Sequence, residues 1–213
     1  MKKLISTTLM IAMFVTLALS QNPSLTMRGI AKEAVPSYKF SVSTTWLTFL
    51  NFGEEKTNTH HYEFHFGYKL TPKDKIGIKV ATWQLFEPMA IPWGPNKIQE
   101  SEFYPGKLKE RGIGVTYQRI LWKGLFVSTE IYQLWKTYLD ENNEDTGSGF
   151  KLYTSYHLGY HIRLFKNRMY LEPQFHCNYW PIDSEGPQDF EEKESKWSKY
   201  FLFEPNLYIG VNF

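Results

Sequence analysis

The chain has 213 residues, of which 42% are hydrophobic and 17% aromatic, with one cysteine, 24 lysines and arginines, and 22 aspartates and glutamates. This length suits a single domain. The mean hydropathy is negative, which excludes a bundle of membrane-spanning helices, while the aromatic content argues against disorder. The charge is close to balanced, so composition gives no reason to expect nucleic acid as a partner.

The first twenty residues have the pattern of a secretory signal peptide. Two lysines precede an apolar run over 4–18, and Ala18-Leu19-Ser20 has the small residues of a cleavage site. The run is shorter than the roughly 20 apolar residues that a spanning helix needs. Lys2 and Lys3 account for the whole formal net charge of +2. We therefore predict a signal peptide over 1–20, a short periplasmic segment over 21–36 and a folded domain over 37–213.

Beyond the signal peptide, apolar and polar residues alternate with the period of a β-strand. Eight alternating segments are predicted, near 37–50, 60–70, 75–86, 111–122, 124–138, 149–165, 168–180 and 200–213. Most are long enough to match the roughly 9–11 residues with which a tilted strand crosses a bilayer. The pattern predicts an all-β protein, an eight-stranded antiparallel up-and-down transmembrane β-barrel.

The predicted connections differ in length. Tight connections are expected near 71–74, 123–124 and 166–167, and longer ones near 51–59, 87–110, 139–148 and 181–199. Short and long connections alternate strictly, as in an up-and-down barrel whose two rims face different compartments. Sixteen of the 22 acidic residues fall in the long connections, which are therefore expected to form acidic loops at the cell surface.

Alternation alone leaves open which phase faces inward. A lipocalin-like barrel would hold a lipophilic ligand in an apolar lumen, whereas an outer-membrane barrel sets its apolar phase against lipid. Three observations favour the membrane. The strand glycines share the polar phase, Arg119 is the one charge in the apolar phase, and aromatic residues cluster near strand ends. The glycines are Gly67, Gly77, Gly112, Gly114, Gly159 and Gly210, and the aromatic residues are Trp46, Trp122, Trp135, Phe165 and Trp180.

With its signal peptide, its eight alternating segments and its last residues, Leu207-Tyr208-Ile209-Gly210-Val211-Asn212-Phe213, the chain resembles the small eight-stranded outer-membrane β-barrels of Gram-negative bacteria, the OmpA-like and OmpW-like group. The resemblance implies a location in the bacterial outer membrane and contact with its lipid and lipopolysaccharide. It also implies that Leu207, Ile209, Val211 and Phe213 form the signal read by the barrel-assembly machinery. It does not specify a function, because such barrels include anchors, adhesins, conduits and lipid-modifying enzymes.

The polar phase predicts a network of charged and imidazole side chains in the lumen. Its members are Glu63, His65, Lys69, Lys79, Glu130, Lys151, His157, His161, Arg163, Glu172, His176 and Glu204. Carboxylates and imidazoles are also the groups that bind zinc or perform acid–base chemistry. Since a bore of this width is filled by its own side chains and buried charges must be paired, the favoured interpretation is a salt-bridge plug without metal, cofactor or catalytic residues.

Two prolines interrupt this pattern, in Leu171-Glu172-Pro173-Gln174-Phe175 and in Phe203-Glu204-Pro205-Asn206-Leu207. Proline lacks the amide donor of a strand ladder, so Pro173 and Pro205 predict bulges or local breaks in pairing. The favoured interpretation is a device that twists the sheet so that the barrel closes. The alternative is a lateral opening between these two strands.

The leading functional hypothesis is a non-enzymatic barrel with a structural or surface-interaction role. A conduit or binder for a small lipophilic solute is the first alternative, and a lipid-modifying enzyme is the second. The acidic loops suggest a further hypothesis, the collection of divalent cations beside lipopolysaccharide. The sequence gives no indication of the oligomeric state.

Overall fold

The computed structural model describes residues 38–51, 59–89 and 103–213. These belong to a compact unit, Ser37–Phe213. The predicted signal peptide over 1–20 and the segment over 21–36 lie outside the described residues. Where the chain is described, no helix is long and apolar enough to cross a membrane.

Nine strands and two short helices make up the described fold. The strands are β1 (Phe40–Thr45), β2 (Tyr62–Lys69), β3 (Asp74–Leu85), β4 (Gly106–Trp122), β5 (Leu125–Asp140), β6 (Asp145–Tyr160), β7 (Ile162–Leu164), β8 (Met169–Asp183) and β9 (Tyr200–Asn212). The helices are η1 (Trp46–Leu50), of 3-10 type, and α2 (Gln188–Glu194).

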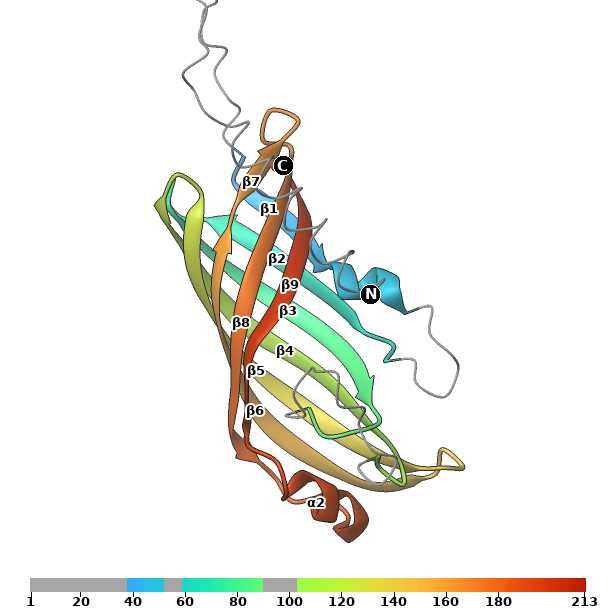
Figure 1. The fold of residues 1–213 in the computed structure, drawn as a ribbon. Coiled ribbons are helices and arrows are strands. Elements are labelled where there is room, and N and C mark those ends of the chain that lie inside the picture. The colour runs from blue at the N-terminus through green and yellow to red at the C-terminus, as the bar shows by residue number, and fades with distance from the viewer. Residues whose placement is uncertain (1–37, 52–58, 90–102) are drawn as a thin grey trace, which may run out of the picture. The chain divides into compact units, whose positions relative to one another are not determined.

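The strands form one antiparallel sheet that closes on itself (Figure 1). Each strand from β1 to β6 pairs with the next, β6 pairs with β8, β8 with β9, and β9 with β1. The short β7 continues β6 beyond His161 and pairs with β8. Eight strands therefore form a barrel-like ring, which confirms the predicted all-β antiparallel architecture and the predicted number of strands.

The first predicted segment, 37–50, was wrong as a single strand. Extended structure ends at Thr45, and η1 follows. The hydroxyl of Thr45 accepts a hydrogen bond from the amide of Leu47, and the hydroxyls of Thr44 and Thr48 lie 3.0 Å apart. Such local bonds from threonine side chains compete with the strand ladder and favour helix initiation.

The strict alternation of short and long connections was also wrong. The predicted long connection 139–148 is a four-residue hairpin, because β5 extends to Asp140 and β6 begins at Asp145. The carboxylate of Asp140 accepts hydrogen bonds from the amides of Asn142 and Glu144, which holds this turn together. The connection 87–110 is shorter than predicted as well, since β4 begins at Gly106.

The ring decides which phase faces inward. The polar phase is buried, with Glu63 and Glu130 only 4% and 3% exposed, whereas Phe66 and Val115 of the apolar phase are 52% and 61% exposed. Apolar side chains therefore cover the outer surface and charged side chains fill the inside. This is the reverse of a lipocalin-like barrel, and that alternative is rejected.

Towards the ends of the strands nearest the long connections, the interior becomes aromatic. The buried side chains there include Trp83, Tyr132, Tyr153, Trp180 and Phe201. Trp180 stacks on Tyr153 with ring centroids 6.1 Å apart and is 5% exposed, so its predicted place in an outer aromatic belt was wrong. Trp180 is separated from Glu172 and His176 by an even number of positions, so its side chain lies on the same inward face of β8.

The helix α2 lies at the same end of the ring. It begins after Pro187. The carboxylates of Asp189 and Glu191 in its first turn stabilise the helix, because they lie near the positive end of the helix dipole. Its buried Phe190 packs between Tyr104 and Tyr138, with ring centroids 4.9 and 5.0 Å away. This contact anchors the connection between β8 and β9 to the end of β5.

Candidate functional site

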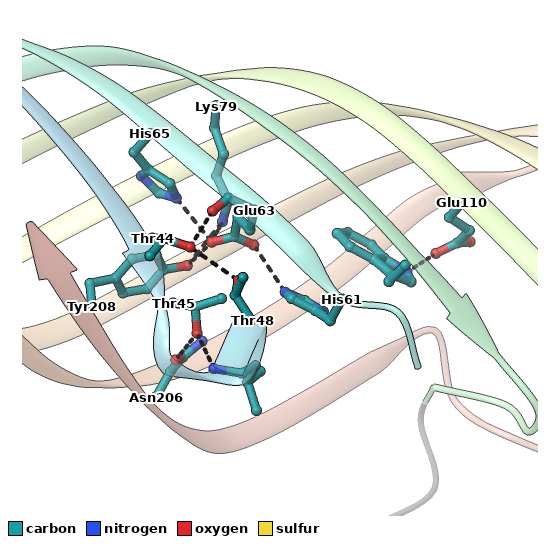
Figure 2. A network of polar contacts seen from close by, with 12 residues as sticks. Thr44, Thr45, Thr48, His61, Glu63, His65, Lys79, Glu110, Asn206 and Tyr208 are labelled. Carbon is teal, nitrogen blue, oxygen red and sulfur yellow. Dashed lines mark hydrogen bonds and ion pairs between the residues drawn. The ribbon is translucent and has the colours of Figure 1, made fainter. Parts of the chain in front are cut away.

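At the centre of the lumen, one lysine joins two carboxylates. The amine of Lys79 lies 2.9 Å from Glu63 Oε1 and 2.6 Å from Glu130 Oε2, with all three side chains buried. The hydroxyl of Tyr208 donates to Glu63, and His65 Nε2 lies 3.0 Å from the same carboxylate oxygen (Figure 2). These contacts satisfy the buried charges and tie β2, β3, β5 and β9 together.

Two further histidines lie beside this cluster. The rings of His157 and His176 are 4.0 Å apart, and His157 Nε2 is 3.7 Å from Glu130 Oε2. Although these residues were candidates for metal binding, the described residues include no group of three or more His, Cys, Asp or Glu side chains placed to hold a metal ion.

A second polar layer lies closer to the short turns. The carboxylate of Glu172 accepts a hydrogen bond from Gln118 at 2.8 Å, lies 2.8 Å from His161 Nδ1, and is 3.6 Å from the amine of Lys75. The space between Glu172 and Glu130 contains a void of only about 30 Å³, which is room for about two water molecules. The lumen is therefore filled at this level.

A third group of charges lies nearer the long connections. The amine of Lys151 is 2.7 Å from Glu110 Oε1, and Trp83 Nε1 donates to the other oxygen of that carboxylate at 2.6 Å. Lys136 pairs with Asp183 at 2.6 Å. Three of these charged residues, Glu110, Lys136 and Asp183, were absent from the predicted network.

The predicted network is thus only partly assembled. Lys69 and Arg163 lie near the short turns, where Arg163 is exposed, and neither forms an ion pair with an acidic side chain among the described residues. Lys75 and Tyr208 take part although they were not predicted. Each lies in the same inward-facing phase of its strand as a predicted member. The alternation of the sequence could therefore have identified both.

Glu204 differs from the other lumen carboxylates because no cation is paired with it in the described part of the chain. Its Oε2 accepts a hydrogen bond from Asn178 Nδ2 at 2.7 Å, and Asn178 Oδ1 in turn accepts one from the hydroxyl of Ser155 at 2.6 Å. This chain of neutral donors links β9, β8 and β6.

The two prolines have different surroundings. Phe203, two residues before Pro205, has a positive φ of 59° and lies at the one register shift between β8 and β9. Pro173 pairs in register with Leu207, and on its other side lies the interruption between β6 and β7 at His161. Because β8 and β9 stay paired from Met169 to Tyr179, the alternative of a lateral opening between them is not supported.

The predicted assembly-signal residues lie in the last strand. Val211 and Phe213 are 43% and 61% exposed on the outer surface, and Leu207 and Ile209 are half-buried. The amide of Phe213 donates to the carbonyl of Phe40 at 2.9 Å, which closes the ring at the chain end.

A cavity of about 340 Å³, lined by polar and aromatic side chains, lies between the Lys79 cluster and the long connections. Its lining includes Glu63, Lys79, Tyr132 and Glu204, together with Leu47 of η1. The lumen therefore has a filled part and a hollow part, and the hollow part is the candidate binding site.

Glu194 belongs to α2, in the connection between β8 and β9 and not in a strand of the ring. We expect it to make the packing of α2 against the end of the ring sensitive to pH. Burial raises the pKa of its carboxyl, although Lys151 and Lys136 oppose this. Tyr104 donates a hydrogen bond to it at 2.8 Å. A carboxyl with a raised pKa in the folded state holds its proton more tightly there, so stability falls as the pH rises between the unfolded and folded pKa values.

We expect Glu194→Gln to remove this loss, since glutamine still accepts the bond from Tyr104. Hydrogen exchange of the α2 amides between about pH 4 and about pH 7 measures the effect. The same pH dependence in both proteins would contradict the expectation, and Glu192→Gln on the exposed side of α2 is the matched control.

No family model, curated protein or solved structure matches this chain. Its function is therefore inferred from its own geometry.

Proposed function

We propose that this chain is an outer-membrane β-barrel protein of the OmpA-like and OmpW-like kind, exported by a cleaved signal peptide, with a plugged lumen and a non-enzymatic structural or surface-interaction role. The observation that carries the proposal is the distribution of side chains over the ring. Apolar residues such as Phe66, Ile78 and Val115 are exposed on the outside, and the charged residues are inside.

This distribution suits lipid as the outer solvent. Exposed apolar surface on this scale is unfavourable in water and is typical of a membrane or interaction surface. The ring pairs most backbone groups of each strand with neighbouring strands, as a bilayer requires. In this orientation, the last strand presents the outward residues implicated in recognition by the assembly machinery, and lipid and lipopolysaccharide are the surrounding partners.

The ion pairs of Lys79 and the near absence of space beside Glu172 support a lumen that does not conduct. Charged side chains that bond to one another leave no continuous path for hydrated ions. The acidic hairpin 141–144 and the connection carrying α2 are then available at the cell surface for contacts with other molecules.

The purified chain, folded into planar bilayers, is expected to give no stable ionic conductance. The shift in gel mobility between heated and unheated samples shows on the same preparation that the barrel is folded. Regular, stepwise conductance from folded protein would overturn the plug. Failure to insert into bilayers or vesicles at all would overturn the proposed location.

The cavity beside Glu204 favours a second candidate function, the binding of a small solute. It extends from the plug towards the long connections, so a solute could reach it without crossing the filled part of the lumen.

A further inference from the structure

The cavity lies where the wall of the ring is incomplete. β1 pairs with β9 only as far as Thr45 and Tyr208, whereas β9 begins at Tyr200. The first half of β9 therefore lacks a strand partner on this side among the described residues, and η1 follows β1 at the same level (Figure 1). Leu47 of η1 and Phe201 of β9 both line the cavity, so it extends to this gap.

Aromatic rings contribute to the cavity wall beside its polar groups. Trp83, Tyr132 and Tyr153 all line it, and the ring of Tyr153 lies edge-on to the other two at centroid distances of 6.4 and 6.0 Å. The faces of such rings carry negative potential and attract cations. One face of Tyr132 already holds the amine of Lys79, 4.7 Å from the ring centroid, and His61 stacks on one face of Trp83, so a ligand would meet their remaining faces or edges. Small-molecule sites combine such apolar and aromatic surface with placed polar groups.

The charges in the wall favour a cation over an anion. Four carboxylates line the cavity, those of Glu63, Glu87, Glu130 and Glu204, but only one ammonium group, that of Lys79. Lys79 is bonded to the first two carboxylates, and Glu204 is bonded only to the neutral Asn178. Neither Glu204 nor Glu87 pairs with a lysine or arginine in the described part of the chain, so these two carboxylates remain to pair with a positively charged ligand.

Two buried polar atoms also point to a missing partner. The hydroxyl of Tyr132 and Nε2 of His176 have no hydrogen-bond partner among the described residues, and the two residues are 1% and 5% exposed. Both residues line the cavity. Since most buried polar atoms in folded proteins are hydrogen-bonded, these two are candidates for contacts with a ligand.

We propose that this cavity binds a small organic cation, an ammonium group carried on an apolar body. The ammonium lies by Glu204 and the aromatic faces, and the apolar body lies against Leu47 and Phe201. An anionic amphiphile would face four carboxylates, and a neutral one would leave Glu204 without a charge partner. The inference rests on the second candidate function, solute binding in this cavity, and names the class of solute; it does not depend on the proposed location in the outer membrane.

Isothermal titration calorimetry on the full folded chain in detergent tests this directly. The probe is phenyltrimethylammonium, with benzenesulfonate as an anion of similar size and benzyl alcohol as a neutral comparator. We expect the cation to bind with a Kd of about 1 mM or tighter, and the other two compounds to bind at least tenfold more weakly. This selectivity is measured on the unmodified chain, so it does not depend on whether any variant folds.

Glu204→Gln identifies the site. Glutamine keeps an acceptor for Asn178 and removes only the charge, so we expect at least a tenfold loss in affinity for the cation. Glu141→Gln, on the exposed hairpin, is the matched control and should bind as the unmodified chain does. No binding of the cation, or equal binding of benzenesulfonate, overturns the proposal, as does unchanged affinity in folded Glu204→Gln. None of these results bears on conductance or on insertion into lipid.

Discussion

Replacing Lys79 with methionine is expected to lower the free energy of unfolding by about 3–5 kcal/mol, the largest loss among single substitutions in the lumen. The amine of Lys79 lies within 2.9 Å of carboxylate oxygens of both Glu63 and Glu130, and these side chains are buried. Without the lysine, two negative charges would remain close together and lack their ammonium partner. Urea unfolding from lipid vesicles, followed by tryptophan fluorescence, measures the change.

The control for this substitution is Lys73→Met, in the exposed turn between β2 and β3. A second variant separates the loss of charge balance from the loss of packing. The triple substitution Glu63→Gln, Lys79→Met and Glu130→Gln removes all three charges together, and we expect it to recover most of the stability lost in the single variant. If Lys79→Met were no more harmful than Lys73→Met, the plug would have no energetic role.

Introducing arginine at Val115 is expected to destabilise the protein in lipid vesicles by about 2–4 kcal/mol, as for a cation on the lipid face of a barrel near the midplane. Val115 is 61% exposed on the outer surface, and its neighbours in register are Ile78 and Ile131. The same substitution on a surface facing water would change stability by only about 0.5 kcal/mol. Urea unfolding from vesicles therefore distinguishes the two solvents.

The matched control is Glu141→Arg, in the hairpin between β5 and β6, which adds an arginine at a position expected to face water. It should leave the unfolding free energy nearly unchanged. Equal and small effects at both positions would indicate that the outer surface does not face lipid. This experiment tests the proposed location separately from the plug, which depends on the inward phase alone.

Several errors in the predicted boundaries share one cause. Glu110, Asp140, Asp145 and Asp183 were assigned to loops because charged residues with nearby glycine and asparagine are typical of loops. In the structure β4, β5, β6 and β8 extend through them, since partners across the sheet hold the backbone extended and Lys136 and Lys151 neutralise two of the carboxylates. Local composition cannot reveal such partners, which lie tens of residues away in the sequence.

Part of the candidate site could be predicted from the sequence. The inward phase correctly gathered Glu63, Lys79, Glu130 and His176 on one face of the sheet, because alternation is a property of each strand by itself. Which carboxylate meets which lysine depends on strand register and on the curvature of the ring. The cavity depends in addition on the early end of β1 at Thr45, where local threonine hydrogen bonds replace the ladder.

Sequence alone determined the number of strands, their antiparallel order and the division of each strand into a polar and an apolar face, since these follow from the two-residue period and the short turns. Alternation alone left the inward face open, because a sheet with two different faces can curve in either direction; the strand glycines favoured a polar interior, and the tertiary structure confirmed it. Only the tertiary structure decided where Lys79 seals the lumen and where Glu204 is left beside a cavity, since both depend on contacts across the closed ring.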